Sequence, residues 1–68
     1  MQQDQLRQAL RELNGERDCR FIFEGTIEQL IVRNALLIPE EPDGLVKVSD
    51  GKKVYILDAG RIMWFEIG

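Results

Sequence analysis

Residues 45–68 read LVKVSDGKKVYILDAGRIMWFEIG, and this stretch carries the clearest structural signals of the chain. Two runs rich in β-branched residues flank Asp50-Gly51, a pair favoured in tight β-turns, so residues 45–57 are predicted to form a hairpin. A second short turn at residues 58–60 leads into a last strand. The C-terminal third of the chain is therefore predicted to be antiparallel β-structure.

Two more strand-like runs precede this stretch. CRFIFEGTI, residues 19–27, alternates apolar and polar side chains, and Gly25 within it predicts a bulge or sharp bend. LIVRNALLIP, residues 30–39, is punctuated at Arg33-Asn34 and ends at a proline. EEPDG, residues 40–44, is predicted to be a solvated loop before the hairpin.

The N-terminal segment has a helical pattern. Residues 4–14 read DQLRQALRELN, and a helix stop follows at Asn14-Gly15. The polar face mixes both charges, which favours packing onto the domain over binding at a membrane surface. The apolar stripe at helical spacing consists of Leu6, Ala9, Leu10 and Leu13.

The 68 residues leave room for a single domain, residues 1–68, with a helix at about 4–14 and strands within 19–67. This order predicts a mainly β protein, an N-terminal helix followed by a five-stranded, strongly bent SH3-like small barrel. No apolar run reaches the ~20 residues of a membrane span. Residues 1–11 lack the apolar core of a signal peptide, and the expected location is cytoplasmic.

Chains of this size usually need a disulfide, a metal or oligomerisation to be stable. Cys19 is the only cysteine and the chain has no histidine, so neither an intrachain disulfide nor the usual zinc site is available. Oligomerisation remains. The last strand supports it, because both of its faces are largely apolar and a free apolar edge invites pairing. A neighbouring copy or the N-terminal helix could cover the second face. The faces are Ile62, Trp64 and Glu66 on one side and Met63, Phe65 and Ile67 on the other.

The sequence predicts no catalysis, no cofactor and no metal. The commonest general base is missing, and Cys19 is interpreted as a structural thiol because no imidazole is present to activate it. Ser49 lies beside the hairpin turn, where serine is a turn residue. The carboxylates of residues 40–43 match no calcium-loop spacing, and the glycines are dispersed at turns.

The net charge of −3 counts against non-specific binding to nucleic acid, which depends on neutralising phosphates. Residues 1–20 are balanced, and the acidic excess comes from residues 21–68. Local basic patches remain compatible with this balance, because a small protein can segregate charge between its faces.

The order of elements and the segment VYILDAGRIM, residues 54–63, resemble the Sm-like (LSm) family of small RNA-associated barrels that form rings. In that family the fourth strand ends in a short turn that leads into an apolar fifth strand, as residues 58–60 lead into 62–67 here. FEGTI, residues 23–27, is similar to the family segment in which a glycine lets a strand bend sharply. The order of elements covers most of the chain, whereas the specific motif spans about ten residues.

The chain departs from the family at the nucleotide pocket. Bacterial members carry a Lys-His pair after the fourth-strand aromatic, where this chain has Ile56-Leu57. Archaeal and eukaryotic members carry an Arg-Gly pair in the following turn, where this chain has residues 58–61, DAGR.

The resemblance implies a homo-oligomeric ring that binds single-stranded RNA on one face. Tyr55 would stack on a base, Lys52, Lys53 and Arg61 would contact phosphates, and Arg33-Asn34 would line the centre of the ring. Each also has a structural interpretation: a half-buried strand residue for Tyr55, a solvated edge-protecting hairpin for the lysines, and a turn for Arg33-Asn34. The expected subunit contacts are made by Val54, Ile56, Met63, Trp64, Phe65 and Ile67.

Two hypotheses follow from the sequence. The first is a ring-forming Sm-like protein that binds single-stranded RNA. The second is an SH3-like module that assembles with itself or with a protein partner and binds no RNA. The acidic balance and the missing pocket residues favour the second, whereas the element order serves both.

Overall fold

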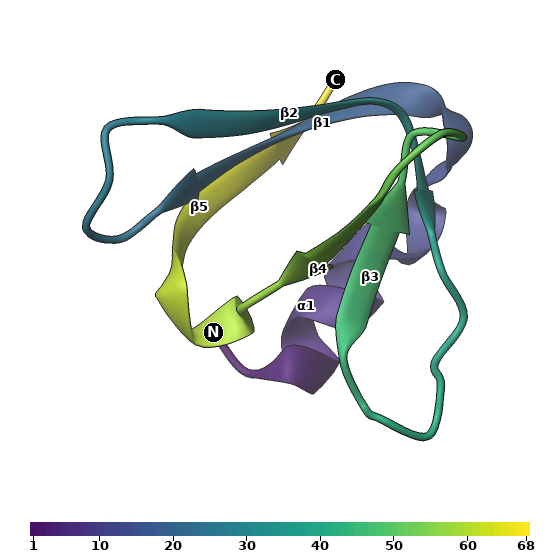
Figure 1. The fold of residues 1–68 in the computed structure, drawn as a ribbon, viewed down its shortest axis with the longest axis horizontal. Coiled ribbons are helices and arrows are strands. Elements are labelled where there is room, and N and C mark those ends of the chain that lie inside the picture. The colour runs from purple at the N-terminus through teal and green to yellow at the C-terminus, as the bar shows by residue number, and fades with distance from the viewer.

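The computed structural model covers residues 1–68 and contains one α-helix, two short 3₁₀ turns and five strands (Figure 1). The mainly β class and the N-terminal helix are thereby confirmed. In chain order the elements are α1 (Gln3–Ala9), η1 (Leu10–Glu12), β1 (Asn14–Phe23), β2 (Gln29–Leu37), β3 (Val46–Ser49), β4 (Val54–Leu57), η2 (Ala59–Arg61) and β5 (Ile62–Ile67).

The strands form one antiparallel sheet in the order β4-β3-β2-β1-β5. β1 and β2 are the long central pair, and β5 lies along β1. β2 pairs with β3 only through Leu36 and Leu37, so β3 and β4 turn away from the other three strands (Figure 1). Helix α1 lies against β3 and η2.

The sheet does not close on itself. β4 and β5 are its two edge strands, and no ladder joins them within the chain. A closed SH3-like barrel is therefore not confirmed, although the sheet has the predicted strand number and a pronounced bend (Figure 1). Both edge strands keep free backbone N–H and C=O groups along one side.

One apolar core lies between the helix and the bent sheet. Leu6 and Leu10 of the helical segment are fully buried, as the stripe predicted, and Phe21 is the largest buried side chain. Only 13 of 68 residues are buried, which is a small core for an independent domain. The apolar core residues are Leu6, Leu10, Leu13, Cys19, Phe21, Val32, Ala35, Val46, Val48, Leu57, Ala59 and Ile62.

Two boundaries differ from the sequence prediction. The α-helix ends at Ala9 and tightens into a 3₁₀ turn, so the helical segment stops before Leu13. β1 begins at Asn14, five residues before the predicted start, and bulges twice in its first half. The polar stretch at residues 14–18 gives no alternating signal, and only its pairing with β2 makes it a strand.

Two positions that the sequence predicted as a bend and a turn have a different role in the structure. Gly25 lies in the turn between β1 and β2, with φ of +84°, and not in a bend within a strand. Arg33-Asn34 lies inside β2 and not in a loop. Asn34 has φ of +49°, so the pair marks an irregularity where β2 bends.

The confirmed elements are those with the clearest local signals. The loop at residues 40–44, the β3–β4 hairpin and the final strand lie where the sequence predicted them. No helix has the length and apolar character needed to cross a membrane.

Candidate functional site

The two sheet edges carry exposed apolar side chains. Val54 and Ile56 on β4 are 56% and 61% exposed, and Met63 at the start of β5 is 64% exposed. Alternation along β4 turns Tyr55 and Leu57 toward the core. Each edge therefore combines unpaired backbone groups with apolar side chains that nothing in the chain covers.

The interior face of β5 is already occupied. Phe65 packs against the ring of Phe21 at a centroid distance of 5.6 Å, and Ile67 also packs against the core. These two residues, predicted as subunit contacts, are thus partly engaged within the chain. Met63 stays exposed, so the N-terminal helix does not cover the start of β5.

Trp64 lies on the outer face of β5, with the guanidinium of Arg20 5.3 Å from its ring centroid. Arg20 also forms an ion pair with Glu66 and donates to the Gln29 side chain at 3.0 Å. These contacts hold Trp64 in a fixed environment while leaving it 46% exposed.

The β3–β4 hairpin tip is organised by Asp50. Its Oδ1 accepts the backbone N–H groups of Lys52 at 2.8 Å and Lys53 at 2.7 Å. Its Oδ2 accepts the Tyr55 hydroxyl at 3.4 Å. The N–H bonds from Lys53 and Lys52, followed by the Tyr55 bond, lower the pKa of Asp50. The two lysine side chains are exposed and form no ion pair.

Tyr55 is half-buried against the core, as its structural interpretation expected. Its hydroxyl reaches Asp50 across the hairpin end. The ring is therefore positioned by contacts within the chain, and only part of it is accessible for stacking.

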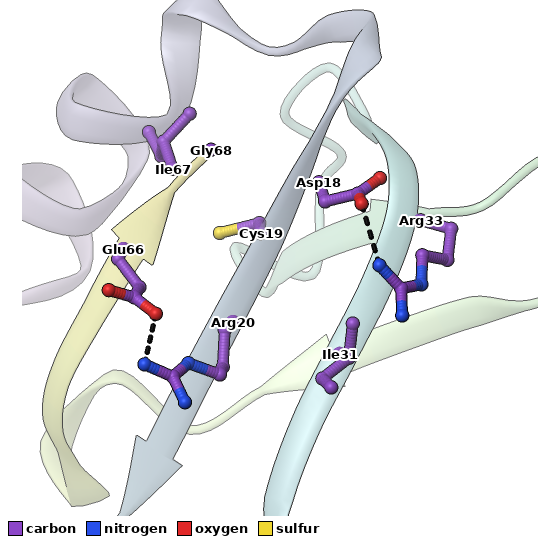
Figure 2. Close-up of a pocket in the computed structure, with 8 residues that line it drawn as sticks. All are labelled: Asp18, Cys19, Arg20, Ile31, Arg33, Glu66, Ile67 and Gly68. Carbon is purple, nitrogen blue, oxygen red and sulfur yellow. Dashed lines mark hydrogen bonds and ion pairs between the residues drawn. The ribbon is translucent and has the colours of Figure 1, made fainter.

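Arg33 and Asn34 are held by Asp18 on the neighbouring strand. Asp18 Oδ1 accepts the Asn34 backbone N–H at 3.0 Å, and Oδ2 accepts Arg33 Nη1 at 2.8 Å (Figure 2). These two hydrogen bonds lower the pKa of Asp18, and the bond from the Asn34 N–H has the larger effect. Asp18 thus secures the irregular point of β2, and the charge of Arg33 is partly neutralised.

Arg61 lies apart from these groups. It ends η2, where its Nε is 3.5 Å from Asp58 Oδ2 and its carbonyl accepts the Glu24 N–H. Leu36, just after the bend of β2, pairs with Ser49 at the end of β3, so the hairpin tip that follows Ser49 lies at the same end of the sheet as this bend. The 3₁₀ turn η2 follows β4 and therefore lies at the opposite end of that strand (Figure 1). One chain therefore gathers Arg33, Asn34, Lys52 and Lys53 at one end and leaves Arg61 at the other.

A shallow cleft of about 310 Å³ opens at the C-terminal end of β5 (Figure 2). Two ion pairs flank it, Asp18 with Arg33 and Arg20 with Glu66, so its charges are balanced. Cys19 lies in its floor, and burial raises the pKa of this thiol to about 11. Isolated charges on a strand carry no motif, so no sequence pattern predicts that Asp18, Arg20 and Glu66 line a common cleft. No three histidine, cysteine or carboxylate side chains gather where they could hold a metal ion.

Comparison with known proteins adds no relative: no family model, no curated protein and no solved structure matches the chain.

Proposed function

We propose that this chain assembles with copies of itself through its two open sheet edges, β4 of one copy against β5 of the next, to form a homo-oligomeric ring. The observation that carries the proposal is the pair of unpaired edges with exposed Val54, Ile56 and Met63. Pairing would satisfy the free backbone groups and bury these side chains together. The five strands and the bend of the sheet support the proposal, since the resemblance to the Sm-like family led us to expect both.

The small core supports the same proposal. A 68-residue chain buries a limited share of its apolar surface, and a second copy is the remaining source of burial once disulfides are excluded. A ring suits a contact between two different edges, because each copy offers one β4 and one β5, and closure leaves no free edge.

The alternation of side chains matches across the proposed contact. On the outer face, Val54 and Ile56 of one copy would lie beside Trp64 of the next. On the inner face, Tyr55 would face Phe65, both already turned toward the core. This arrangement brings apolar side chains together on both faces of the joined strands.

Sedimentation velocity tests the assembly. We expect a species well above 7.9 kDa at tens of micromolar protein. Met63→Lys on β5 and Ile56→Lys on β4 should each give monomers, because a charge would be buried without a partner. Both positions are exposed in one chain, so the fold itself should persist. Ile27→Lys, at the fully exposed β1–β2 turn, is the matched control and should assemble normally.

A mixing experiment makes the test specific to the two edges. Met63→Lys keeps an intact β4 and Ile56→Lys keeps an intact β5, so an equimolar mixture should form a heterodimer and stop there. A wild-type chain that stays monomeric, or edge variants that assemble like the control, would overturn the proposal.

The second candidate function is binding of single-stranded RNA by the assembled ring. It is favoured by the exposed, unpaired Lys52 and Lys53, which lie at the same end of the sheet as Arg33. A ring would bring one such cluster from every copy into a repeated array, and avidity would multiply weak sites. Tyr55, half-buried beside the lysines, would supply base stacking.

Titration of labelled oligo-U and oligo-A at about 50 mM salt tests RNA binding, since ionic contacts are favoured there. Tyr55→Ala should weaken binding by about 1–3 kcal/mol, the usual cost of losing one stacked base. Tyr55→Phe keeps the aromatic side chain but loses the hydrogen bond to Asp50, and this variant should bind RNA nearly as well as wild type. If the homo-oligomer assembles but binds neither oligonucleotide, the chain is a self-assembling module that does not bind RNA.

A further inference from the structure

A second cleft, of about 330 Å³, lies between the helical segment and the chain that leaves β2. Its apolar walls come from Leu13 and residues 37–39, and its charged groups are Arg7, Arg11 and Glu40. It is separate from both sheet edges and from the hairpin tip.

Arg7 is the unusual group in this cleft. Its side chain is only 10% exposed, and Nη2 donates to the carbonyls of Gly44 at 3.3 Å and Leu45 at 3.2 Å. Its Nε and Nη1 are buried and have no hydrogen-bond acceptor. A guanidinium has five N–H donors, so three of them remain unsatisfied here. Buried donors of a charged group that lack acceptors cost free energy, and a ligand with suitable oxygens would recover it.

No group of the chain supplies the missing acceptor. Glu40 forms only a long ion pair with Arg7: its Oε1 lies 3.9 Å from Nε, beyond hydrogen-bond distance, and the Glu40 side chain is largely exposed. Asp43, the other nearby carboxylate, is bonded to Lys47 Nζ at 2.7 Å and to the Leu45 N–H at 3.0 Å. The exposed Arg11 adds a second positive charge without an ion pair.

We propose that this cleft binds an oxyanion, a phosphate or a carboxylate group, between Arg7 and Arg11, with Glu40 swinging outward to admit it. Arginine donors match such oxygens in geometry and charge, and the apolar walls strengthen the interaction by excluding water. Glu40 acts as the internal competitor, because its carboxylate already lies against the Arg7 edge that the ligand would use.

The proposal is tested by NMR titration of the isotopically labelled protein with sodium phosphate, against sodium chloride at the same ionic strength. We expect saturable shifts at the Arg7 Nε–H and at the backbone amides of Leu37, Ile38 and Glu40, with a Kd on the order of 1 mM. A parallel titration with acetate separates the two ligand sources: a response to phosphate alone assigns a phosphate site, and an equal response to acetate assigns a carboxylate site.

Three exposed substitutions give the matched set. Arg11→Gln should weaken phosphate binding about threefold, the scale of one exposed charge contact. Glu40→Gln should strengthen it by a similar factor, because the competing carboxylate is gone. Arg17→Gln removes an arginine that pairs with Glu12 outside the cleft and should change nothing. Non-saturable shifts, or equal affinity in all three variants, would show that Arg7 serves only to anchor residues 44 and 45.

Discussion

At the residue scale, the β1–β2 turn requires a positive φ, because Gly25 has φ of +84° there. A Cβ at this position would meet no atom within 4 Å, so a substitution acts through the backbone alone. We expect Gly25→Val to lower the free energy of unfolding by about 1–2 kcal/mol, since β-branched residues disfavour positive φ. Gly60→Ala is the control: φ is ordinary there, and urea denaturation should show a change within about 0.5 kcal/mol.

Asp18 gives a second prediction at this scale. Its pKa is lowered by the Asn34 N–H and by Arg33, so its carboxylate stabilises the folded chain above the unfolded pKa of about 4. This contribution is lost as the pH falls through the lower folded pKa. Asp18→Asn should therefore be less stable than wild type at neutral pH, and the difference should shrink below about pH 4.

Urea midpoints measured across this pH range check the prediction. Glu16→Gln removes a carboxylate that forms no ion pair and should leave the acid dependence unchanged. A constant difference between Asp18→Asn and wild type at every pH would mean that the carboxylate charge does not secure Asn34.

At the element scale, Asp50 makes most of the side-chain hydrogen bonds that hold the tip of the β3–β4 hairpin, and Ser49 Oγ accepts one more, from the Gly51 N–H. Asp50 accepts three hydrogen bonds that hold the tip and position Tyr55. Asp50→Ala should lower the melting temperature, because two turn N–H groups and the tyrosine hydroxyl lose their acceptor. Asp50→Asn keeps a side-chain oxygen and should recover part of the loss. Equal melting temperatures for both variants would contradict this role.

The same hairpin shows which elements can be predicted from neighbouring residues alone. Asp50-Gly51 between two alternating runs predicts both strands, and the structure confirms them because turn chemistry acts within four residues. The start of β1 could not be predicted in this way. Residues 14–18 are polar and become a strand only by pairing with residues 35 and 36, about twenty positions away.

At the scale of the whole molecule, the open sheet encloses one small core with Cys19 inside it. Because burial raises the pKa of this thiol to about 11, only about one molecule in a thousand carries the thiolate at pH 8. Labelling with a thiol reagent should therefore be slow in the native protein and should accelerate in urea as the core opens. Edge variants that dissociate the assembly should label faster than wild type. Fast labelling of native wild type would contradict the burial of Cys19.

Local patterns in the chain predict the helix, the number of strands and most turns. Apolar spacing and turn residues act between neighbours, so they can be recognised without knowing where distant segments lie. Met63 is also predicted as a contact residue in this way, from apolar side chains on both faces of the last strand, whereas Ile56 is predicted through the resemblance to the Sm-like family.

Contacts between distant segments, in contrast, determine which strand edges stay open and which charged groups are buried. Arg7 has the pattern of a solvent-facing helix residue, yet residues 44 and 45 fold over it from 37 and 38 positions away. Asp18 and Arg33 are 15 residues apart and meet only because β1 and β2 pair in that register. Burial and ion pairing depend on such long-range approaches, and no local spacing encodes them.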